Sequence, residues 1–186
     1  MDMGAASWRE RRAARVLRKG GIVVHPTEAV FGLAACAGLR GACDRVRRLK
    51  GRGQAKPFLI VVARTEQLAG LVELEVPLRA EILASWPGPH TWVLPADRRA
   101  PRWLQNARGG IAVRVTAHPQ VRALCELAGP MISTSANASG HPPARSMLAA
   151  RRYFGARVDD YLVGRLGGAK RPSILRDGQT GQVLRA

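Results

Sequence analysis

The sequence predicts an α/β protein built on a twisted, mixed open sheet with helices packed against it. Short apolar runs alternate with segments whose apolar residues recur every three or four positions, the pattern of strands alternating with amphipathic helices. Gly and Pro stand at the ends of these runs, where chains turn. The 186 residues are 46% hydrophobic and contain no linker or repeat, so we expect one domain over residues 1–186.

The elements can be assigned in chain order. A helix is expected from the capping-box pair Ser7 and Glu10 to the glycines at 20 and 21. A buried strand over 22–25 should then stop at Pro26, and a loop over 27–38 should lead to a helix that delivers Lys50 at its end. Further strands are predicted over 58–62, 91–94, 111–115 and 131–134, helices over 65–72, 77–86, 119–128 and 146–154, and short strands near Tyr161, Ile174 and Val183.

The charge balance is strongly positive. Thirty Lys and Arg residues against 13 Asp and Glu give a net charge of +17, a field that attracts phosphates of any kind. The excess is nearly all Arg and is spread from Arg9 to Arg185. An RNA partner and a bias toward Arg codons explain it equally well. A basic RNA-binding protein without catalytic activity is therefore the alternative function, although only 5% of residues are aromatic and no stacking platform is evident.

Composition excludes several other classes of protein. No apolar run approaches the roughly 20 residues that span a bilayer, and the first residues lack the apolar core of a secretory signal, so we expect a cytoplasmic protein without a membrane partner. Cys36, Cys43 and Cys125 cannot all pair, and neither they nor the four scattered His residues show metal-ligand spacing. We expect no metal held by protein side chains alone.

Two separated polar clusters point to a ligand. Lys50, Arg52 and Lys56 lie among glycines, in a chain with only four lysines, and a compact ammonium suits a phosphate. Ser133, Ser135 and Asn137 follow an apolar run some eighty residues later. Cations and hydroxyls together can hold a nucleotide triphosphate, although the spacing is not that of a P-loop.

Two further residues have polar groups in apolar surroundings. Thr27 lies between Pro26 and Gly32, where its hydroxyl can bind a polar ligand or cap a turn. Arg114 interrupts an apolar run, and a guanidinium there needs an anionic or carbonyl partner. An internal acid and a bound carboxylate both remain open as that partner.

Five motifs in order resemble one family. From about residue 21 to residue 177 the chain is similar to the threonylcarbamoyl-AMP synthase family, also called the YrdC-like or Sua5/TsaC family, in its short, single-domain bacterial form. The motifs are PTEAVFG at 26–32, Lys50 with Arg52, WPGPHT at 86–91, AVRV at 112–115 and STSANASG at 133–140. Longer members have a His where this chain has Val62 and Ala63, and a Thr where it has Gly110, so contacts made there are missing or replaced.

The resemblance implies a reaction and a set of site residues. L-threonine, bicarbonate and ATP, with Mg²⁺, would give threonylcarbamoyl-AMP and pyrophosphate for the threonylcarbamoyladenosine modification of tRNA. The product would pass to a downstream threonylcarbamoyl-transferase complex. Lys50 and Arg52 would be catalytic, and Thr27, Arg114 and Ser133 would hold threonine. The residues implied to bind ATP are Lys50, Arg52, Lys56, Ser135, Asn137 and Arg145.

A different carbamoyl-adenylate enzyme of similar fold is the other alternative. Such enzymes in hydrogenase maturation or antibiotic carbamoylation add domains that include Cys-rich zinc modules. Three Cys residues without paired spacing argue against those modules here.

Overall fold

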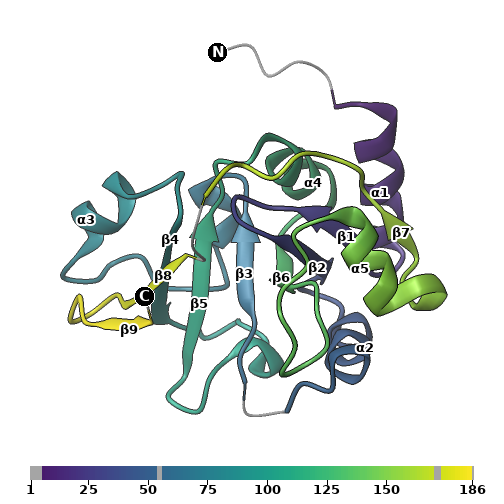
Figure 1. The fold of residues 1–186 in the computed structure, drawn as a ribbon. Helices are drawn as coiled ribbons and strands as arrows, with labels where there is room; N and C mark the ends of the chain where they lie inside the picture. The colour runs from purple at the N-terminus through teal and green to yellow at the C-terminus, as the bar shows by residue number, and fades with distance from the viewer. Residues whose placement is uncertain (1–5, 54–55, 170–172, 186) are drawn as a thin grey trace.

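The computed structural model describes residues 6–53, 56–169 and 173–185, which form a mixed open sheet with helices on both faces (Figure 1). The sheet in the described residues has nine strands in the order β7-β1-β2-β6-β3-β5-β4-β8-β9. Strand pairs β1/β7, β3/β5 and β4/β8 are parallel, and the other five pairs are antiparallel. The predicted fold class is confirmed.

Most element bounds lie close to their predicted positions. Ser7 and Glu10 form the expected capping box of the first helix. The helices are α1 (Trp8–Arg18), α2 (Arg40–Lys50), α3 (Arg79–Ala84), α4 (Pro119–Ala128) and α5 (Met147–Phe154). The strands are β1 (Val23–Pro26), β2 (Phe31–Cys36), β3 (Leu59–Val62), β4 (His90–Pro95), β5 (Gly110–Val115), β6 (Met131–Ser135), β7 (Asp160–Tyr161), β8 (Ile174–Asp177) and β9 (Val183–Arg185).

Strand β2 is the main correction to the predicted elements, because a loop was expected over 27–38. Residues 31–36 are mostly Gly, Ala and Leu, which have little intrinsic preference for a strand. They are extended because β2 pairs with β1 on one side and with β6 on the other. The strand state of this segment therefore comes from tertiary pairing.

Two predicted helices are shorter than expected. Residues 65–72 contain only the 3₁₀ helix Thr65–Leu68, after which Gly70 has a φ of 76° and Val72 forms an isolated bridge to Ala96. The helix predicted over 77–86 is reduced to α3. In both segments the apolar residues pack into the larger core, as they would from one face of a longer helix. Their spacing alone therefore did not distinguish a longer helix from a short helix followed by irregular chain.

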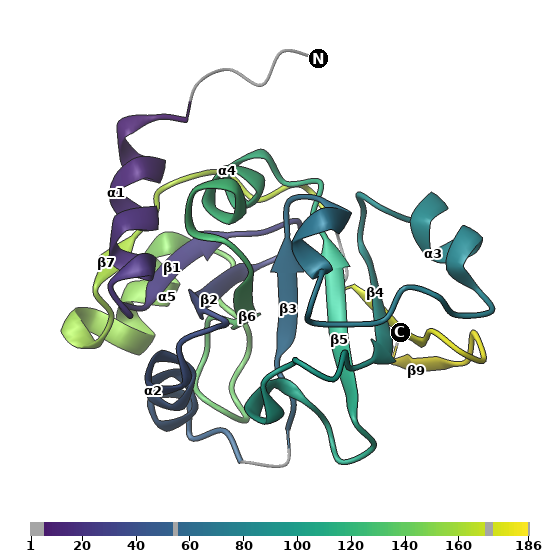
Figure 2. The ribbon, with the colours of Figure 1, turned by 180° about the vertical axis from the view of Figure 1, so that it is seen from behind.

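The helices leave part of one sheet face uncovered. Helices α1 and α4 lie side by side over β1, β2, β3 and β6, and bury a cluster that includes Leu17, Leu124, Val61 and Met131 (Figure 2). The larger core, with α2 and α5, lies on the opposite face.

No helix in the described part of the chain has the length and apolar character needed to cross a membrane.

Candidate functional site

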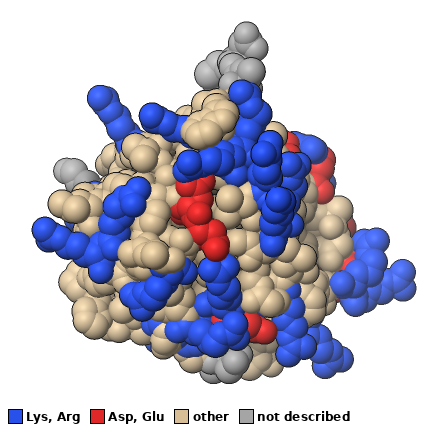
Figure 3. Space-filling view, turned by 90° about the vertical axis from the view of Figure 1, so that its right-hand side faces the viewer, with Lys and Arg blue, Asp and Glu red and all other residues tan. Residues whose placement is uncertain are grey.

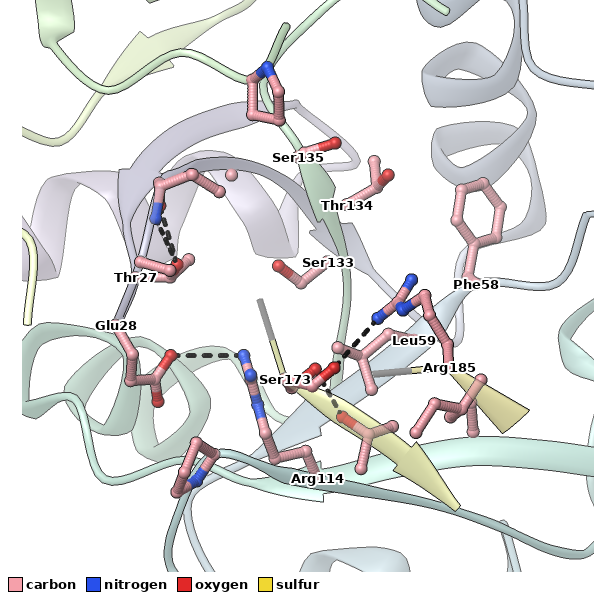
Figure 4. Close-up of a pocket in the computed structure, with 18 of the residues that line it drawn as sticks. Thr27, Glu28, Phe58, Leu59, Arg114, Ser133, Thr134, Ser135, Ser173 and Arg185 are labelled. Atoms are coloured by element: carbon pink, nitrogen blue, oxygen red, sulfur yellow. Dashed lines mark hydrogen bonds and ion pairs between the residues drawn. The ribbon is translucent and has the colours of Figure 1, made fainter. Parts of the chain in front are cut away.

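A pocket of about 330 Å³ lies on the sheet face that α1 and α4 leave open (Figure 4). Its floor is a row of cross-strand partners, since Leu59 of β3 is opposite both Ala112 of β5 and Ser133 of β6. Two positions along, Val61 and Met131 belong to the cluster beneath α1 and α4, so pocket and cluster share one face. The walls include residues 27–32 and four residues from the end of the chain, Ala169, Ser173, Leu175 and Arg185.

The two polar clusters of the sequence meet beside this pocket. The Lys50 ammonium donates hydrogen bonds to the backbone oxygens of Ser135 and of Asn137 (2.8 Å), and to the Asn137 side-chain oxygen (3.3 Å). The backbone N–H of Ser139 donates to the Lys50 carbonyl at 2.9 Å. Burial and the neighbouring charge of Arg52 lower the pKa of Lys50 to about 8, so it stays mostly protonated at neutral pH. Lys50 thus holds the end of α2 against the segment after β6.

Replacing Lys50 with methionine is expected to lower the free energy of unfolding by about 2 kcal/mol, because it leaves buried carbonyl oxygens without donors. Urea denaturation of the Lys50→Met variant measures this loss. Lys19→Met is the matched control, since the Lys19 side chain is exposed at the end of α1. Equal stability of the two variants would contradict the structural role of Lys50.

Arg114 is paired at the bottom of the pocket with an internal acid. Its guanidinium lies 3.3 Å from the carboxylate of Glu28, whose other oxygen accepts a 2.6 Å hydrogen bond from Thr116. Burial acts to raise the pKa of Glu28, but Arg114 and the Thr116 hydrogen bond oppose it and the net pKa is lowered. Within the described residues the buried Nε of Arg114 has no hydrogen-bond partner. The Arg114 side chain also lines the pocket, which brings its guanidinium to the space a ligand would fill.

Two hydroxyls face the same space as Arg114. Figure 4 shows Thr27 and Ser133 on opposite sides of the cavity, turned toward one another. The Thr27 hydroxyl donates a 2.7 Å hydrogen bond to the Val30 carbonyl, which fixes its direction. Ser133 is nine-tenths buried and its Oγ lies 3.4 Å from Nε2 of His25.

The imidazole of His25 is fully buried beneath the pocket. Burial, with a smaller effect of His118 and Arg114 opposed by Glu28, lowers its pKa from 6.5 to about 4. As the pH falls, His25 is therefore protonated near pH 6.5 in the unfolded chain but only near pH 4 in the folded protein. The contribution of neutral His25 to the free energy of unfolding is complete at neutral pH and is lost as the pH falls from about 6.5 to about 4.

Urea denaturation at pH 7 and at pH 4.5 tests this linkage. We expect the difference in unfolding free energy between the two pH values to shrink by about 2 kcal/mol in His25→Gln, which cannot titrate. An unchanged difference would show that His25 titrates normally in the folded protein.

Two less buried cations of the lining, Arg52 and Arg185, belong to the outer part of the pocket, which we call its mouth. The Arg52 guanidinium is half-buried and is held by a 2.7 Å hydrogen bond to the Pro57 carbonyl. Arg185 of β9 donates to the Ser173 carbonyl at 3.3 Å and also lines the pocket. The described lining residues include three guanidinium groups and one carboxylate, so the pocket has a net positive charge and attracts anions.

The predicted site residues are divided by the structure into two groups. Thr27, Arg52, Arg114, Ser133 and Ser135 line the pocket. Lys50, Lys56, Asn137 and Arg145 are not among the residues that form its walls. The Asn137 amide donates within its own loop, to Ala138 and His141. Lys56 precedes the wall residue Pro57, and Arg145 follows the wall residue Pro143 by two positions.

Five polar residues of the pocket were not predicted as site residues: Glu28, Thr91, Thr134, Ser173 and Arg185. Glu28 stands in the PTEAVFG motif next to Thr27, but no role was predicted for its carboxylate. Ser173 accepts a 2.9 Å hydrogen bond from Thr91. It belongs to none of the five motifs, so no signal in the sequence pointed to it. Arg185 is one of 26 arginines, and only the pairing of β9 with β8 brings it to the pocket.

The donor set of the pocket does not suit a protein-bound metal. In the parts of the chain that the structure describes, no three His, Cys, Asp or Glu side chains gather as metal ligands. Glu28 is already paired with Arg114. A divalent ion here would need its oxygen ligands from a bound phosphate.

Basic side chains are also spread over the outer surface. Figure 3 shows many Lys and Arg side chains on one face, with Asp and Glu among them. Some form ion pairs, including Arg45 with Asp159 at 2.7 Å and Arg12 with Asp160. On this face the positive charge does not form one continuous patch.

Comparison with known proteins assigns the chain to a family. A family model named for Sua5, YciO and YrdC, and described as telomere recombination, matches residues 15–186. The chain belongs to the Sua5/YciO/YrdC family. The resemblance inferred from the five motifs is thereby confirmed.

Members of the Sua5/YciO/YrdC family with curated names align with nearly the whole chain. A threonylcarbamoyl-AMP synthase of Halorhodospira halophila is 49% identical over 187 residues, covering 98% of this chain and 96% of the relative. One from Nitrosococcus oceani is 45% identical, covering 98% and 100%. The crystal structure of P. abyssi Sua5 complexed with L-threonine is 37% identical, with a TM-score of 0.81, over 91% of this chain. The chain matches 51% of that longer protein.

Proposed function

We propose that this protein is an L-threonylcarbamoyladenylate synthase, a nucleotidyltransferase that converts L-threonine, bicarbonate and ATP to threonylcarbamoyl-AMP and pyrophosphate. The observation that carries the proposal is the juxtaposition, in one cationic pocket, of a buried guanidinium with two oriented hydroxyls. Relatives of nearly equal length carry the name of this activity, which supports it.

The threonine site is proposed at the bottom of the pocket. The Arg114 guanidinium, which lines the pocket, suits the amino-acid carboxylate, since a guanidinium binds carboxylates with paired hydrogen bonds. Thr27 and Ser133 face the position that the amino group would then occupy. The complex of P. abyssi Sua5 with L-threonine supports an amino-acid site in this fold.

ATP is proposed to occupy the mouth of the pocket, where Arg52, Arg185 and Ser135 lie. Lys50 and Asn137 would act by holding the segment after β6 in place, in addition to any phosphate contact. Lys56 and Arg145 stay predicted phosphate partners beside the walls of the pocket. Mg²⁺ would arrive on the triphosphate as part of the substrate.

The reaction needs no protein nucleophile. The threonine amine attacks the carbon of bicarbonate with loss of water, or of CO₂ with loss of a proton from nitrogen, and an oxygen of the resulting N-carboxylate attacks the α-phosphorus of ATP. The bond from that phosphorus to the bridging oxygen breaks and pyrophosphate leaves. The protein contributes positioning and charge neutralisation, with Arg52 placed to offset charge that develops on the phosphates.

The direct test is incubation with ATP, L-threonine and labelled bicarbonate, followed by mass detection of the adenylate. We expect a labelled product that requires all three substrates, with one pyrophosphate for each adenylate. Carbamoyl phosphate in place of threonine and bicarbonate should give none, and a product from it would favour the other carbamoyl-adenylate chemistry. The product would serve tRNA modification through a transferase complex.

The RNA-binding alternative makes an opposite prediction. It requires tight RNA binding that weakens steeply with salt, together with no ATP turnover. The +17 charge favours some RNA contact, and direct contact with tRNA during catalysis is compatible with the proposed reaction. Absence of adenylate formation alongside strong RNA binding would replace the proposed function with this one.

A further inference from the structure

The His25 imidazole lies next to Ser133 because Gly32, between them on the sheet surface, has no side chain. On β1 and β2, His25 and Gly32 are cross-strand partners, and on β2 and β6, Ala34 and Ser133 are partners. His25 therefore reaches Ser133 diagonally across β2, passing over Gly32. A Cβ at Gly32 would lie 2.9 Å from Nε2 of His25 and 3.2 Å from Oγ of Ser133. Only glycine at this position allows the two side chains to meet.

The hydrogen bonds of His25 fix which nitrogen carries the proton. Its Nδ1 lies 2.9 Å from the Pro26 carbonyl oxygen, and a carbonyl can only accept, so Nδ1 must be the donor. Burial among His118, Glu28 and Arg114 keeps the ring neutral. The single ring proton is then on Nδ1, and Nε2 is an acceptor.

An acceptor at Nε2 sets the direction of the Ser133 hydroxyl. At 3.4 Å, Ser133 donates its proton to Nε2 and turns its lone pairs toward the pocket. Thr27 is constrained in the same way, because its proton goes to the Val30 carbonyl. Both hydroxyls therefore offer acceptors to a ligand, and neither can donate to an amine and block its lone pair.

We propose that His25 is a positioning residue of the amino-acid site, which orients Ser133 so that the substrate amine meets only acceptors and keeps its lone pair for the carboxylation step. The inference rests on the proposed function, because it assigns the amino group to this position. It adds a residue that the motifs did not single out. His25 acts through Ser133 and touches no substrate.

A matched pair of variants separates orientation from packing. In His25→Gln the amide reaches about as far as Nε2 and can accept the Ser133 proton. In His25→Asn the shorter amide can still donate to the Pro26 carbonyl but does not reach Ser133. We expect kcat/KM for threonine to fall about tenfold in His25→Asn, mainly through kcat, because the released Ser133 hydroxyl can donate to the amine and block its lone pair. KM for ATP should be unchanged. His25→Gln should stay within about threefold of wild type.

A double-mutant cycle with Ser133→Ala completes the test. If His25 acts through Ser133, adding His25→Asn to Ser133→Ala should cost nothing further. The inference would be overturned if the losses in kcat/KM of the two single variants multiply in the double variant. It would also be overturned if His25→Asn and His25→Gln lose the same activity, or if KM for ATP rises as much as kcat/KM for threonine falls. If His25→Asn does not fold, His25→Phe takes its place, because it fills the same space without an acceptor. Adenylate formation by the wild type, measured first, tests the proposed function separately.

Discussion

Arg114→Ala is expected to lower kcat/KM for threonine by about a thousandfold, which is the largest loss we predict for one side chain. The variant removes the guanidinium proposed to bind the substrate carboxylate. It also leaves the Glu28 carboxylate buried with only Thr116 as a partner. Because an unpaired buried charge is costly, the free energy of unfolding should fall by about 3 kcal/mol.

Kinetics and urea denaturation together separate these two effects. The double variant Arg114→Met with Glu28→Gln removes both charges, so it should recover most of the lost stability without recovering activity. Arg114→Lys keeps the charge but not the planar fork, and should stay well below wild-type activity. Full activity in the double variant would contradict the assignment of Arg114 to the substrate carboxylate.

Arg52→Ala is expected to lower kcat by about a hundredfold, with little change in KM for threonine. Arg52 lines the pocket, where the triphosphate is proposed to lie, and is less buried than the residues proposed for the amino acid. Its side chain is half-buried, so its loss should change stability far less than the loss of Lys50. Steady-state pyrophosphate release with each substrate varied in turn measures the effect.

Arg48→Ala provides the control for Arg52. Arg48 lies on α2 four residues earlier, is exposed, and is not among the pocket residues, so the variant loses the same charge away from the site. We expect nearly wild-type kcat from it. Similar losses in both variants would mean that the general positive field matters and the local contact of Arg52 does not.

Much of the fold followed from local sequence patterns. The capping box at Ser7 and the apolar spacing before Lys50 are local signals, and the corresponding helices begin and end close to the expected positions. Strand β2 could not be predicted in this way, because residues 31–36 become a strand through partners that lie before them and a hundred residues after them. The extent of a single domain over residues 1–186 stays a prediction.

The site was predictable in its chemistry and less so in its geometry. Cations and hydroxyls were expected together, and Arg52, Arg114, Thr27 and Ser133 do share a pocket. The phosphate role of Lys50 stays a prediction, but the hydrogen bonds of its ammonium to Asn137 after β6 could not be predicted. The direction of a long flexible side chain depends on which acceptors the fold places around it.

The sequence by itself determined the class of fold, the order of most elements, the family and the types of group available to a ligand. These properties depend on the local spacing of apolar residues and on short motifs. Only the tertiary structure decided that Glu28 is the partner of Arg114, that Arg185 reaches the pocket from the last strand, and that Gly32 lets His25 contact Ser133. Each of these depends on strand pairing between distant segments, and the register of that pairing is fixed by the packing of the whole sheet.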